Sequence, residues 1–564
     1  MRLSSLSRAA VPALAVTTAA ALVAGGVGFT ANADDDTTTI QAAERGKNGS
    51  AGGFDLPKQL TKRVKGDGID EHLDKLQEIS DKFDGNRASG TPGYNASVRY
   101  IVRTLTKAGY TPEVQAFDFA YFVENAPAEL AQTSPDATTY ATPEDFSSMT
   151  YSGSGDVTAA VVAVDTDGTA NAASTSGCEA EDFAAFPEGS IALIQRGSCA
   201  FGQKALNAQE AGAAGVIIFN AGVEGRTDSF VGTLGQPGYE IPVVGTSFAV
   251  GQDLIDPAGT EVRLFADTTS EIRETYNVLA ETRGGDKDNV VMVGSHLDSV
   301  PEGPGINDNG SGSASILETA LKLSKFDKKG KKKGHGKKAK GKGKGKLENQ
   351  VRFAWWGAEE LGLLGSEHYV AELSQEEIDE IALYLNFDMV GSPNYVRFVY
   401  DGDNSEGGGA VGPAGSDDIE EMFNEFFASE GLESEATPFS GRSDYGPFIV
   451  EGVDIPSGGL FTGAEGVKTE EQAAIYGGEA GVAYDPCYHA ECDDRDNVSM
   501  DAIDEMSNAI AHSVATYAVS TEGLGEDSPA PAPRMSKAER KAAEKAARNA
   551  ELHPAHDHSD GLRR

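Results

Sequence analysis

Positive charge is scarce in this sequence of 564 residues, which has 47 Lys and Arg against 88 Asp and Glu. The resulting formal net charge of −41 argues against nucleic acid or an anionic membrane as the main partner. Long apolar runs are missing after the N-terminal region, so no transmembrane span is expected there. The chain is 39% apolar, an ordinary soluble composition, and its length predicts two to four domains.

The first 33 residues have the composition of a secretory signal peptide. Arg2 and Arg8 supply positive charge, an Ala-rich apolar stretch spans 11–27, and Ala-Asn-Ala at 31–33 offers small residues before a cleavage point. A membrane anchor is the alternative, but a proline, two threonines and a Gly-Gly pair interrupt the apolar stretch. We therefore expect a Sec-exported, extracellular protein with no membrane span.

Cysteine is also rare, with four in the whole chain. An even number of cysteines in an exported protein suggests disulfides. Cys178 and Cys199 lie in one segment and Cys487 and Cys492 in another, so we expect the pairs 178–199 and 487–492. A thiolate metal site is the alternative, but neither pair has the two-residue spacing of a zinc knuckle.

Changes in composition and hydrophobic pattern divide the rest of the chain into domains. Residues 34–58 are rich in Thr, Asp and Gly and predict a flexible leader, whereas 59–121 show helical periodicity. Short β-rich runs over 122–268 predict a compact inserted module. Over 269–522 apolar strands alternate with helical stretches, which is typical of a mainly parallel sheet with helices on both faces.

Two segments have compositions foreign to such a fold. Residues 328–346 are almost entirely lysine and glycine, which predicts a disordered insertion in a surface loop. Because this segment is cationic in an anionic protein, it is a candidate for binding acidic cell-wall polymers. Residues 523–564 combine a Pro-rich linker, a charged helical stretch and scattered histidines, and predict a solvated tail.

The stretch GSHLDSVPEGPGINDNGSGSA, 294–314, follows an apolar strand and bends at its glycines and prolines. It carries His296, Asp298 and Asp308. A lone histidine is more often a structural residue than a ligand, and Asp308 could be a turn aspartate. Asp298, however, follows His296 by two extended residues, where a carboxylate could orient a metal-bound imidazole.

Similar residues follow the next predicted strands. Glu359 and Glu360 come after VRFAWW, Asp388 ends IALYLNF, and His489 lies between Cys487 and Cys492. Ligands bind at the carboxyl ends of strands in such sheets. The whole set, two histidines, three ligand-grade carboxylates and a spare glutamate, suits two zinc ions that share a bridging carboxylate. Glu359 is then free to act as a general base.

In this combination the sequence resembles the secreted bacterial zinc aminopeptidases of metallopeptidase clan MH, family twenty-eight, the leucine-aminopeptidase-like enzymes. The resemblance covers 59–121 and 271–522 and rests on GSHLDSVPEGPGINDNGSG, GAEELGLLGS, NFDMVG, SGRSDYGPF, GGLFTGAE and DPCYHAECD. The middle module resembles a protease-associated domain through GCEAEDF and IALIQRGSCAFGQKALNAQEAGAAGVIIFN. The implied fold is α/β, a mixed, mainly parallel central sheet flanked by helices, with the β-rich domain inserted.

The resemblance also implies roles for the candidate residues. Five of them would hold two zinc ions: His296 and Asp388 one, Glu360 and His489 the other, with Asp308 bridging. Glu359 would be the base that takes a proton from the bridging water. Tyr488 would stabilise the oxyanion, and Asp298 would support the catalytic centre from behind a ligand.

Further residues would serve the substrate or a second metal. Arg442, Phe461 and Met389 resemble substrate-pocket residues, although a loop salt bridge and a packed aromatic are the plain alternatives for the first two. Asp504 lies where some relatives bind calcium, but Asn508 stands where an acid is expected, which puts that site in doubt.

The function implied is an extracellular, monomeric aminopeptidase that removes N-terminal residues, large apolar ones such as Leu, from peptides. Other members of the clan are carboxypeptidases or glutaminyl cyclases, and the complete ligand set counts against the cyclase. Still others are receptor ectodomains that have lost ligands. All five ligands and the base are present here, which argues for an enzyme.

Overall fold

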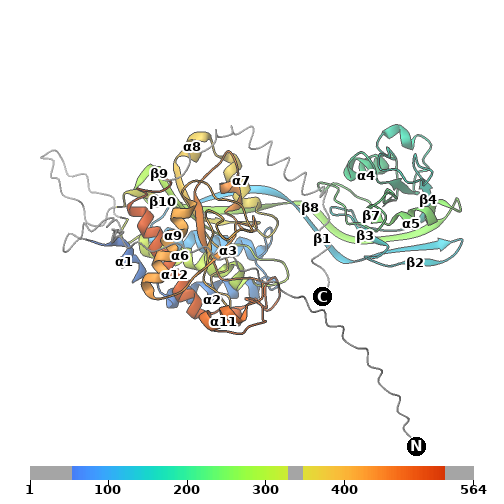
Figure 1. Ribbon diagram of the computed structural model, residues 1–564. Coiled ribbons are helices and arrows are strands. Elements are labelled where there is room, and N and C mark those ends of the chain that lie inside the picture. Colours follow the sequence, from blue (N-terminus) through green and yellow to red (C-terminus); the bar gives the residue numbers. More distant parts are fainter. Residues whose placement is uncertain (1–53, 328–346, 527–564) are drawn as a thin grey trace, which may run out of the picture. The chain divides into compact units, whose positions relative to one another are not determined.

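The computed structural model describes residues 54–327 and 347–526 (Figure 1). The segments before and after the inserted module form an α/β domain. This domain is built on eight strands of a larger sheet. From one edge inward these strands are β13 (Glu435–Thr437), β12 (Phe398–Tyr400), β14 (Ser457–Phe461), β11 (Ile381–Phe387), β9 (Asp286–His296), β10 (Asn349–Trp356), β8 (Glu261–Glu281) and β1 (Glu113–Ser134). The four central strands, β14, β11, β9 and β10, run parallel, which confirms the predicted mixed, mainly parallel sheet.

Helices cover both faces of this sheet. One face packs against α1 (Leu56–Thr61), α2 (Gly66–Lys82), α3 (Pro92–Ala108), α6 (Gly312–Leu323), α9 (Ser416–Glu430) and α12 (Met500–Val519). The other packs against α7 (Leu364–Glu372), α8 (Gln375–Asp379) and α10 (Gly446–Ile449). A short helix, α11 (Glu470–Tyr476), contributes no buried residue.

Strand β9 shows why the sheet is buried on both sides. Val291 and Val293 point into one core and Met292 into the other, and all three are fully buried. A strand buried on both faces needs a continuous apolar run instead of an alternating one. The run that precedes the predicted ligands is therefore a central strand.

The inserted module has its own layers. Its strands are β2 (Thr138–Tyr140), β3 (Phe146–Ser148), β4 (Gly155–Ala163), β5 (Ile191–Gln195), β6 (Gly215–Phe219) and β7 (Val243–Thr246), with helices α4 (Phe201–Glu210) and α5 (Phe248–Ile255). Two separate apolar clusters lie against its sheet. The Cys178–Cys199 disulfide forms as predicted.

Two long antiparallel strands, β1 and β8, belong to both the module and the α/β domain. They pair from Glu113 opposite Leu279 to Ser134 opposite Glu261. The predicted module boundaries, 122 and 268, fall inside these strands, where Phe122 pairs with Ser270 and Glu124 with Thr268. The module thus begins and ends along one hydrogen-bonded ladder.

The predicted N-terminal and charged segments fall almost entirely outside the described residues. These are the signal at 1–33, the insertion at 328–346 and most of the tail. Helix α1 begins at Leu56, inside the predicted leader, because Asp55 caps it and Leu56 is buried. Of the helices in the described ranges, none combines the length and the apolar character needed to cross a membrane.

Candidate metal centre

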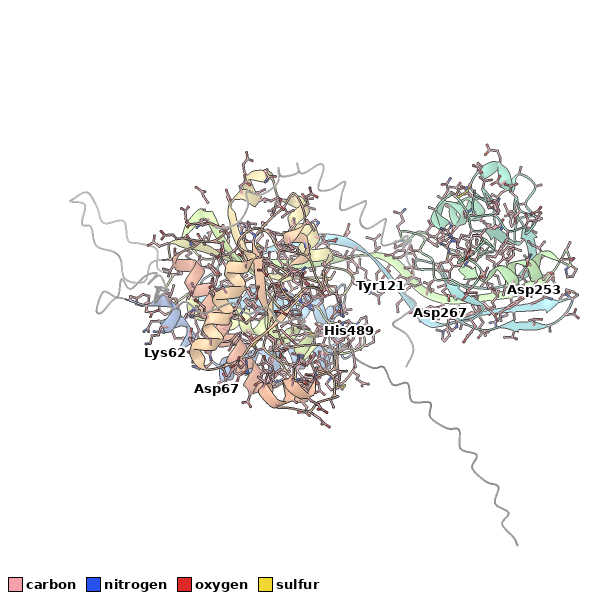
Figure 2. The ribbon with its side chains drawn as sticks, viewed as in Figure 1. Lys62, Asp67, Tyr121, Asp253, Asp267 and His489 are labelled. Carbon is pink, nitrogen blue, oxygen red and sulfur yellow. A yellow bond between two sulfur atoms is a disulfide. The ribbon has the colours of Figure 1, made fainter. Side chains whose placement is uncertain are left out.

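Parallel strands bring the predicted ligands to one edge of the sheet. Strand β9 ends at His296, Glu360 follows β10, and Asp388 follows β11. Because these three strands are neighbours and run the same way, their carboxyl ends meet. Asp308 precedes α6, and His489 comes from a loop closed by the Cys487–Cys492 disulfide. Figure 2 labels His489 within the α/β domain.

The five predicted ligands converge in two groups. His296 Nε2 lies 3.2 Å from Asp308 Oδ1 and 3.2 Å from Asp388 Oδ1. His489 Nε2 lies 3.0 Å from Glu360 Oε2 and 3.3 Å from Asp308 Oδ2. Asp308 therefore gives one oxygen to each group, the arrangement expected of a bridging carboxylate.

These residues fit two zinc ions. Two ligand atoms on a tetrahedral zinc with bonds of ~2.0–2.1 Å lie about 3.3 Å apart, and the distances in each group are close to this. Glu360 Oε1 and Asp388 Oδ1 are buried, and neither has a hydrogen-bond partner among the described residues. Buried, unpaired carboxylate oxygens are stabilised by a cation, and imidazole with carboxylate is a donor set that zinc accepts.

Electrostatics point to the same need for positive charge. Burial raises the pKa of Glu360 to about 8, and the neighbouring charge of Asp308 adds to the rise. Burial also raises the pKa of Glu359 well above its usual range, against the opposing effect of His296. Burial acts the same way on Asp308, but hydrogen bonds from His296 and His489 keep its pKa low. Divalent cations would let these crowded acids ionise together.

Asp298 supports two parts of the centre. Its side chain is fully buried behind His296, whose Nδ1 lies 3.2 Å from the Asp298 carbonyl oxygen and 3.6 Å from Asp298 Oδ1. The same Oδ1 accepts the backbone N–H of Glu359 at 3.3 Å. Asp298 thus contacts both the imidazole of His296 and the backbone at the start of the glutamate pair, and the second contact was not predicted.

The asparagines of the INDNG stretch fasten the Asp308 loop to the Asp388 loop. Asn309 Nδ2 donates to the Phe387 carbonyl, and Asn309 Oδ1 accepts the backbone N–H of Met389. Asn307 Oδ1 accepts the backbone N–H of Gly391. The glycine- and asparagine-rich composition therefore serves a fixed connection between two ligand loops as well as a turn.

Two polar residues near the ligands were missed by sequence reasoning. Ser443 Oγ donates to Asp388 Oδ2 at 2.5 Å and accepts from Asn386 Nδ2 at 2.8 Å. Asp493 accepts the backbone N–H groups of Asn307 at 2.8 Å and Asp308 at 2.9 Å. Both belong to quoted motifs, SGRSDYGPF and DPCYHAECD, but no spacing in the sequence connects them with their partners.

Three non-glycine residues beside or among the ligands have left-handed backbone conformations. Their φ angles are 56° at Ala358, 47° at Met389 and 55° at His489. Such residues are uncommon in proteins and collect at functional sites, where the surrounding structure holds them. Each lies in a different loop of the centre.

The two ligand groups open into a cavity of about 310 Å³. The cavity is also lined by Glu359, Tyr488, Arg442, Phe461 and Met389, so the structure brings every predicted catalytic and pocket residue except buried Asp298 to its wall. Further aromatic residues complete an apolar wall: Phe398, Tyr400, Tyr445 and Tyr484. The arrangement combines a floor of candidate metal ligands with a pocket suited to an apolar side chain.

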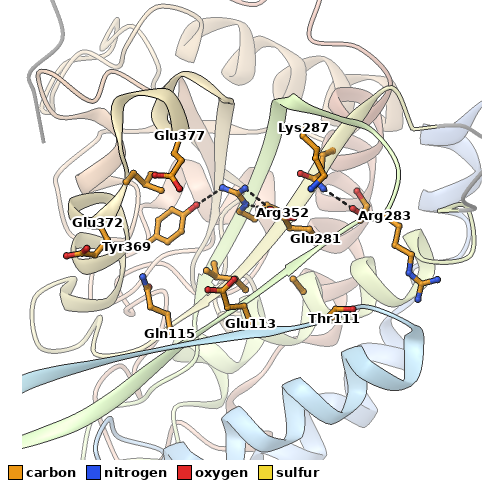
Figure 3. Close-up of a pocket in the computed structure, with 15 residues that line it drawn as sticks. Thr111, Glu113, Gln115, Glu281, Arg283, Lys287, Arg352, Tyr369, Glu372 and Glu377 are labelled. Atoms are coloured by element: carbon orange, nitrogen blue, oxygen red, sulfur yellow. Dashed lines mark hydrogen bonds and ion pairs between the residues drawn. The ribbon is translucent and has the colours of Figure 1, made fainter.

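A larger cavity of about 490 Å³ lies elsewhere and contains none of the predicted site residues (Figure 3). It adjoins the first residues of β10 and includes Arg352, which donates to Tyr369 at 2.7 Å and to Glu281 at 2.8 Å. The partly buried Arg352 is thus engaged in internal bonds. The chemistry of the smaller cavity, and not size, identifies the functional site.

The predicted calcium site has a single acidic residue in place. Asp504 Oδ1 accepts the backbone N–H of Gly66 at 2.8 Å, and Asp504 belongs to none of the clusters of possible metal ligands found in the described ranges. Calcium binding there stays a prediction. A cluster that was not foreseen, Asp401, Asp403 and Glu420, accepts backbone N–H groups from the loop 402–406.

Known proteins are similar to this chain in sequence and in fold. Peptidase family M28 matches residues 277–514, and the PA domain matches 157–254. An aminopeptidase of Pseudomonas aeruginosa (strain UCBPP-PA14) is 49% identical over 477 residues, which cover 84% of this chain and 84% of the relative. Leucine aminopeptidase 2 of Trichophyton tonsurans is 42% identical over 470 residues, covering 82% of this chain and 86% of the relative.

Among solved structures, the aminopeptidase from Aneurinibacillus sp. strain AM-1 is similar with a TM-score of 0.53 and 26% identity, covering 85% of this chain and 100% of that one. Fold, site and relatives together define the class of this protein, which is a peptidase. More narrowly, the chain belongs to peptidase family M28 and carries an inserted PA domain. The predicted family and fold are confirmed.

Proposed function

We propose that this protein is an exported aminopeptidase that removes N-terminal residues with large apolar side chains, such as leucine, from peptides, with two zinc ions and Glu359 as general base. The observation that carries the proposal is that the two oxygens of Asp308 face His296 and His489, each beside a further carboxylate. The names of the relatives, aminopeptidase and leucine aminopeptidase 2, support the specificity. The signal-like N-terminus supports export.

Five residues would hold the metals: His296 and Asp388 one zinc, His489 and Glu360 the other, and Asp308 both. When bound, zinc supplies Lewis acidity for the scissile carbonyl and makes a water molecule more acidic. One oxygen of each of two carboxylates, Glu360 Oε1 and Asp388 Oδ1, lacks a hydrogen-bond partner among the described residues, and the charge of the ions would compensate for the burial of both groups.

Glu359 would act as the general base of the reaction and then as its general acid. Its Oε2 lies 3.8 Å from His296 Nε2, and the residue lines the cavity without being needed as a ligand. It would accept a proton from the attacking water and deliver it to the departing amine. A positioned acid–base group of this kind contributes about 10²–10⁴-fold to the rate.

Tyr488 is placed to stabilise charge on the carbonyl oxygen. Its ring stacks on His489 with centroids 3.8 Å apart, so the imidazole fixes its direction into the cavity. Its hydroxyl would donate to the oxygen as negative charge develops there. The apolar wall that includes Met389 and Phe461 would take the N-terminal side chain, and acids near the metals would receive the free α-ammonium.

The test uses the zinc-loaded, full-length protein and Leu-p-nitroanilide. The substrate should be cleaved and its N-acetylated form should not, because blocking removes the α-ammonium. A strong chelator should abolish the activity and zinc should restore it. Efficient cleavage of the blocked substrate would indicate an endopeptidase or a carboxyl-end enzyme instead.

A second measurement isolates the base. Glu359→Gln keeps the shape of the side chain but cannot take a proton, so we expect two zinc ions per chain and a rate reduced by about 10²–10⁴-fold. Glu421→Gln, an exposed glutamate of α9, serves as the matched control. A near-normal rate for Glu359→Gln would remove this residue from the mechanism.

A further inference from the structure

Three side chains from three separate loops are joined by hydrogen bonds at the cavity wall. Glu465 Oε1 accepts a hydrogen bond from Arg442 Nη1 at 2.8 Å. Arg442 Nη2 donates to the Tyr488 hydroxyl oxygen at 3.2 Å. Glu465 follows β14, Arg442 precedes α10, and Tyr488 lies in the disulfide loop of His489. All three line the cavity.

The direction of these bonds decides what the Tyr488 hydroxyl can do. A guanidinium has only donors, so the phenol oxygen must accept from Arg442. The single hydrogen of the phenol then remains available for another acceptor, and a charged donor behind the oxygen strengthens it as a donor. Without Arg442 the hydroxyl hydrogen would be free to rotate towards water.

Arg442 cannot hold this position by itself. The side chains of Arg442 and Glu465 are 61% and 57% exposed, and an unrestrained arginine side chain has many rotamers. Glu465 restricts it through the Nη1 atom and leaves Nη2 for Tyr488. Although partial burial opposes it, the hydrogen bond with Arg442 lowers the pKa of Glu465, so the carboxylate is ionised at neutral pH.

We propose that Glu465 is a positioning residue of the reaction, which holds Arg442 against Tyr488 and so directs the Tyr488 O–H at the substrate carbonyl oxygen. The inference rests on the proposed role of Tyr488 as oxyanion donor. Glu465 itself touches neither the metal ligands nor the reacting atoms in this scheme. Its effect should therefore appear in kcat and pass entirely through Tyr488.

The experiment is a double-mutant cycle on the zinc-loaded, full-length enzyme with Leu-p-nitroanilide. Glu465→Ala should lower kcat about tenfold, part of the 10²–10³-fold that loss of an oxyanion donor costs, and leave KM within about twofold. Glu465→Gln should recover most of the rate, because its amide oxygen still accepts from Arg442. In a Tyr488→Phe background, Glu465→Ala should have no further effect. Glu471→Ala, an exposed residue of α11, is the control.

Several results would overturn the inference. A full rate for Glu465→Ala would do so, as would an equal loss in the Tyr488→Phe background, which would mean that Glu465 acts independently. A change confined to KM would assign Glu465 to substrate binding. A full rate for Tyr488→Phe alone would also overturn the inference. The proposed two-zinc aminopeptidase function is tested separately, by the rate of Glu359→Gln. Zinc content and thermal unfolding should match the wild type in every variant.

Discussion

One buried arginine binds the loop between two predicted metal ligands, His296 and Asp308. The side chain of Arg87, which lies between α2 and α3, is fully buried. Its Nε donates to the Pro304 carbonyl at 2.9 Å, and its two Nη atoms donate to the carbonyls of Leu297 and Gly305. The segment it holds connects His296 with Asp308. We expect Arg87→Met to destabilise the protein and weaken zinc binding.

The magnitude follows from the bonds that are lost. Methionine fills most of the volume but cannot donate, so three buried carbonyls lose a charged donor, at about 1–3 kcal/mol each. Burial lowers the pKa of Arg87 to about 10, against the opposing pull of Asp298 and other nearby acids. Removal of the buried charge therefore relieves about 3 kcal/mol. The three lost bonds cost about 3–9 kcal/mol together, so the net loss in the free energy of unfolding should be about 0–6 kcal/mol, with about 3 kcal/mol at the middle of that range.

Urea unfolding measures the stability, and competition with a chelator measures zinc affinity. Arg87→Lys is the matched variant, since it keeps the charge but its single ammonium cannot reproduce the planar fork of the guanidinium. We expect it to recover only part of the loss. If Arg87→Met unfolded at the wild-type urea concentration and kept its zinc affinity, the reasoning from these three bonds would be wrong.

Three further predictions concern other parts of the chain. Cys487→Ser with Cys492→Ser should lower zinc content and activity, because the disulfide encloses the loop of His489; unchanged zinc binding would contradict this. Burial lowers the pKa of Lys204 to about 8, below that of an unfolded lysine, so stability should rise by about 1–2 kcal/mol between pH 8 and 10; Lys204→Met should abolish that rise in denaturant titrations. Replacing 328–346 by a short Gly-Ser loop should keep turnover and weaken salt-sensitive binding to cell walls; loss of activity in a folded protein would refute a tethering role.

The candidate ligands could be proposed from the sequence because each follows a pattern that is local. An apolar run such as the one before His296 predicts a buried strand, and a polar residue at its end predicts a ligand in this kind of sheet. The two disulfides join cysteines 21 and 5 residues apart, so their pairing was also a short-range inference.

The supporting residues could not be read in this way, because their partners are remote in the chain. Ser443 reaches Asp388 across 55 residues, and Arg87 reaches Leu297 across 210. Nothing in the spacing of these residues indicates which carbonyl or carboxylate each will meet. Even Asp298, which was predicted to lie behind His296, has a second contact with Glu359 that spans 61 residues.

The sequence by itself therefore determined the kinds of element and the family, and it supplied the candidate ligands. Hydrophobic periodicity and turn residues depend on residues that are close together in the sequence, so they can be recognised in a single sequence. Only the tertiary structure decided that β9 lies between β10 and β11, and hence that His296 meets Asp388 and Glu359. Strand order and loop contacts arise from packing of the whole sheet, which is why the line from Glu465 through Arg442 to Tyr488 emerged only there.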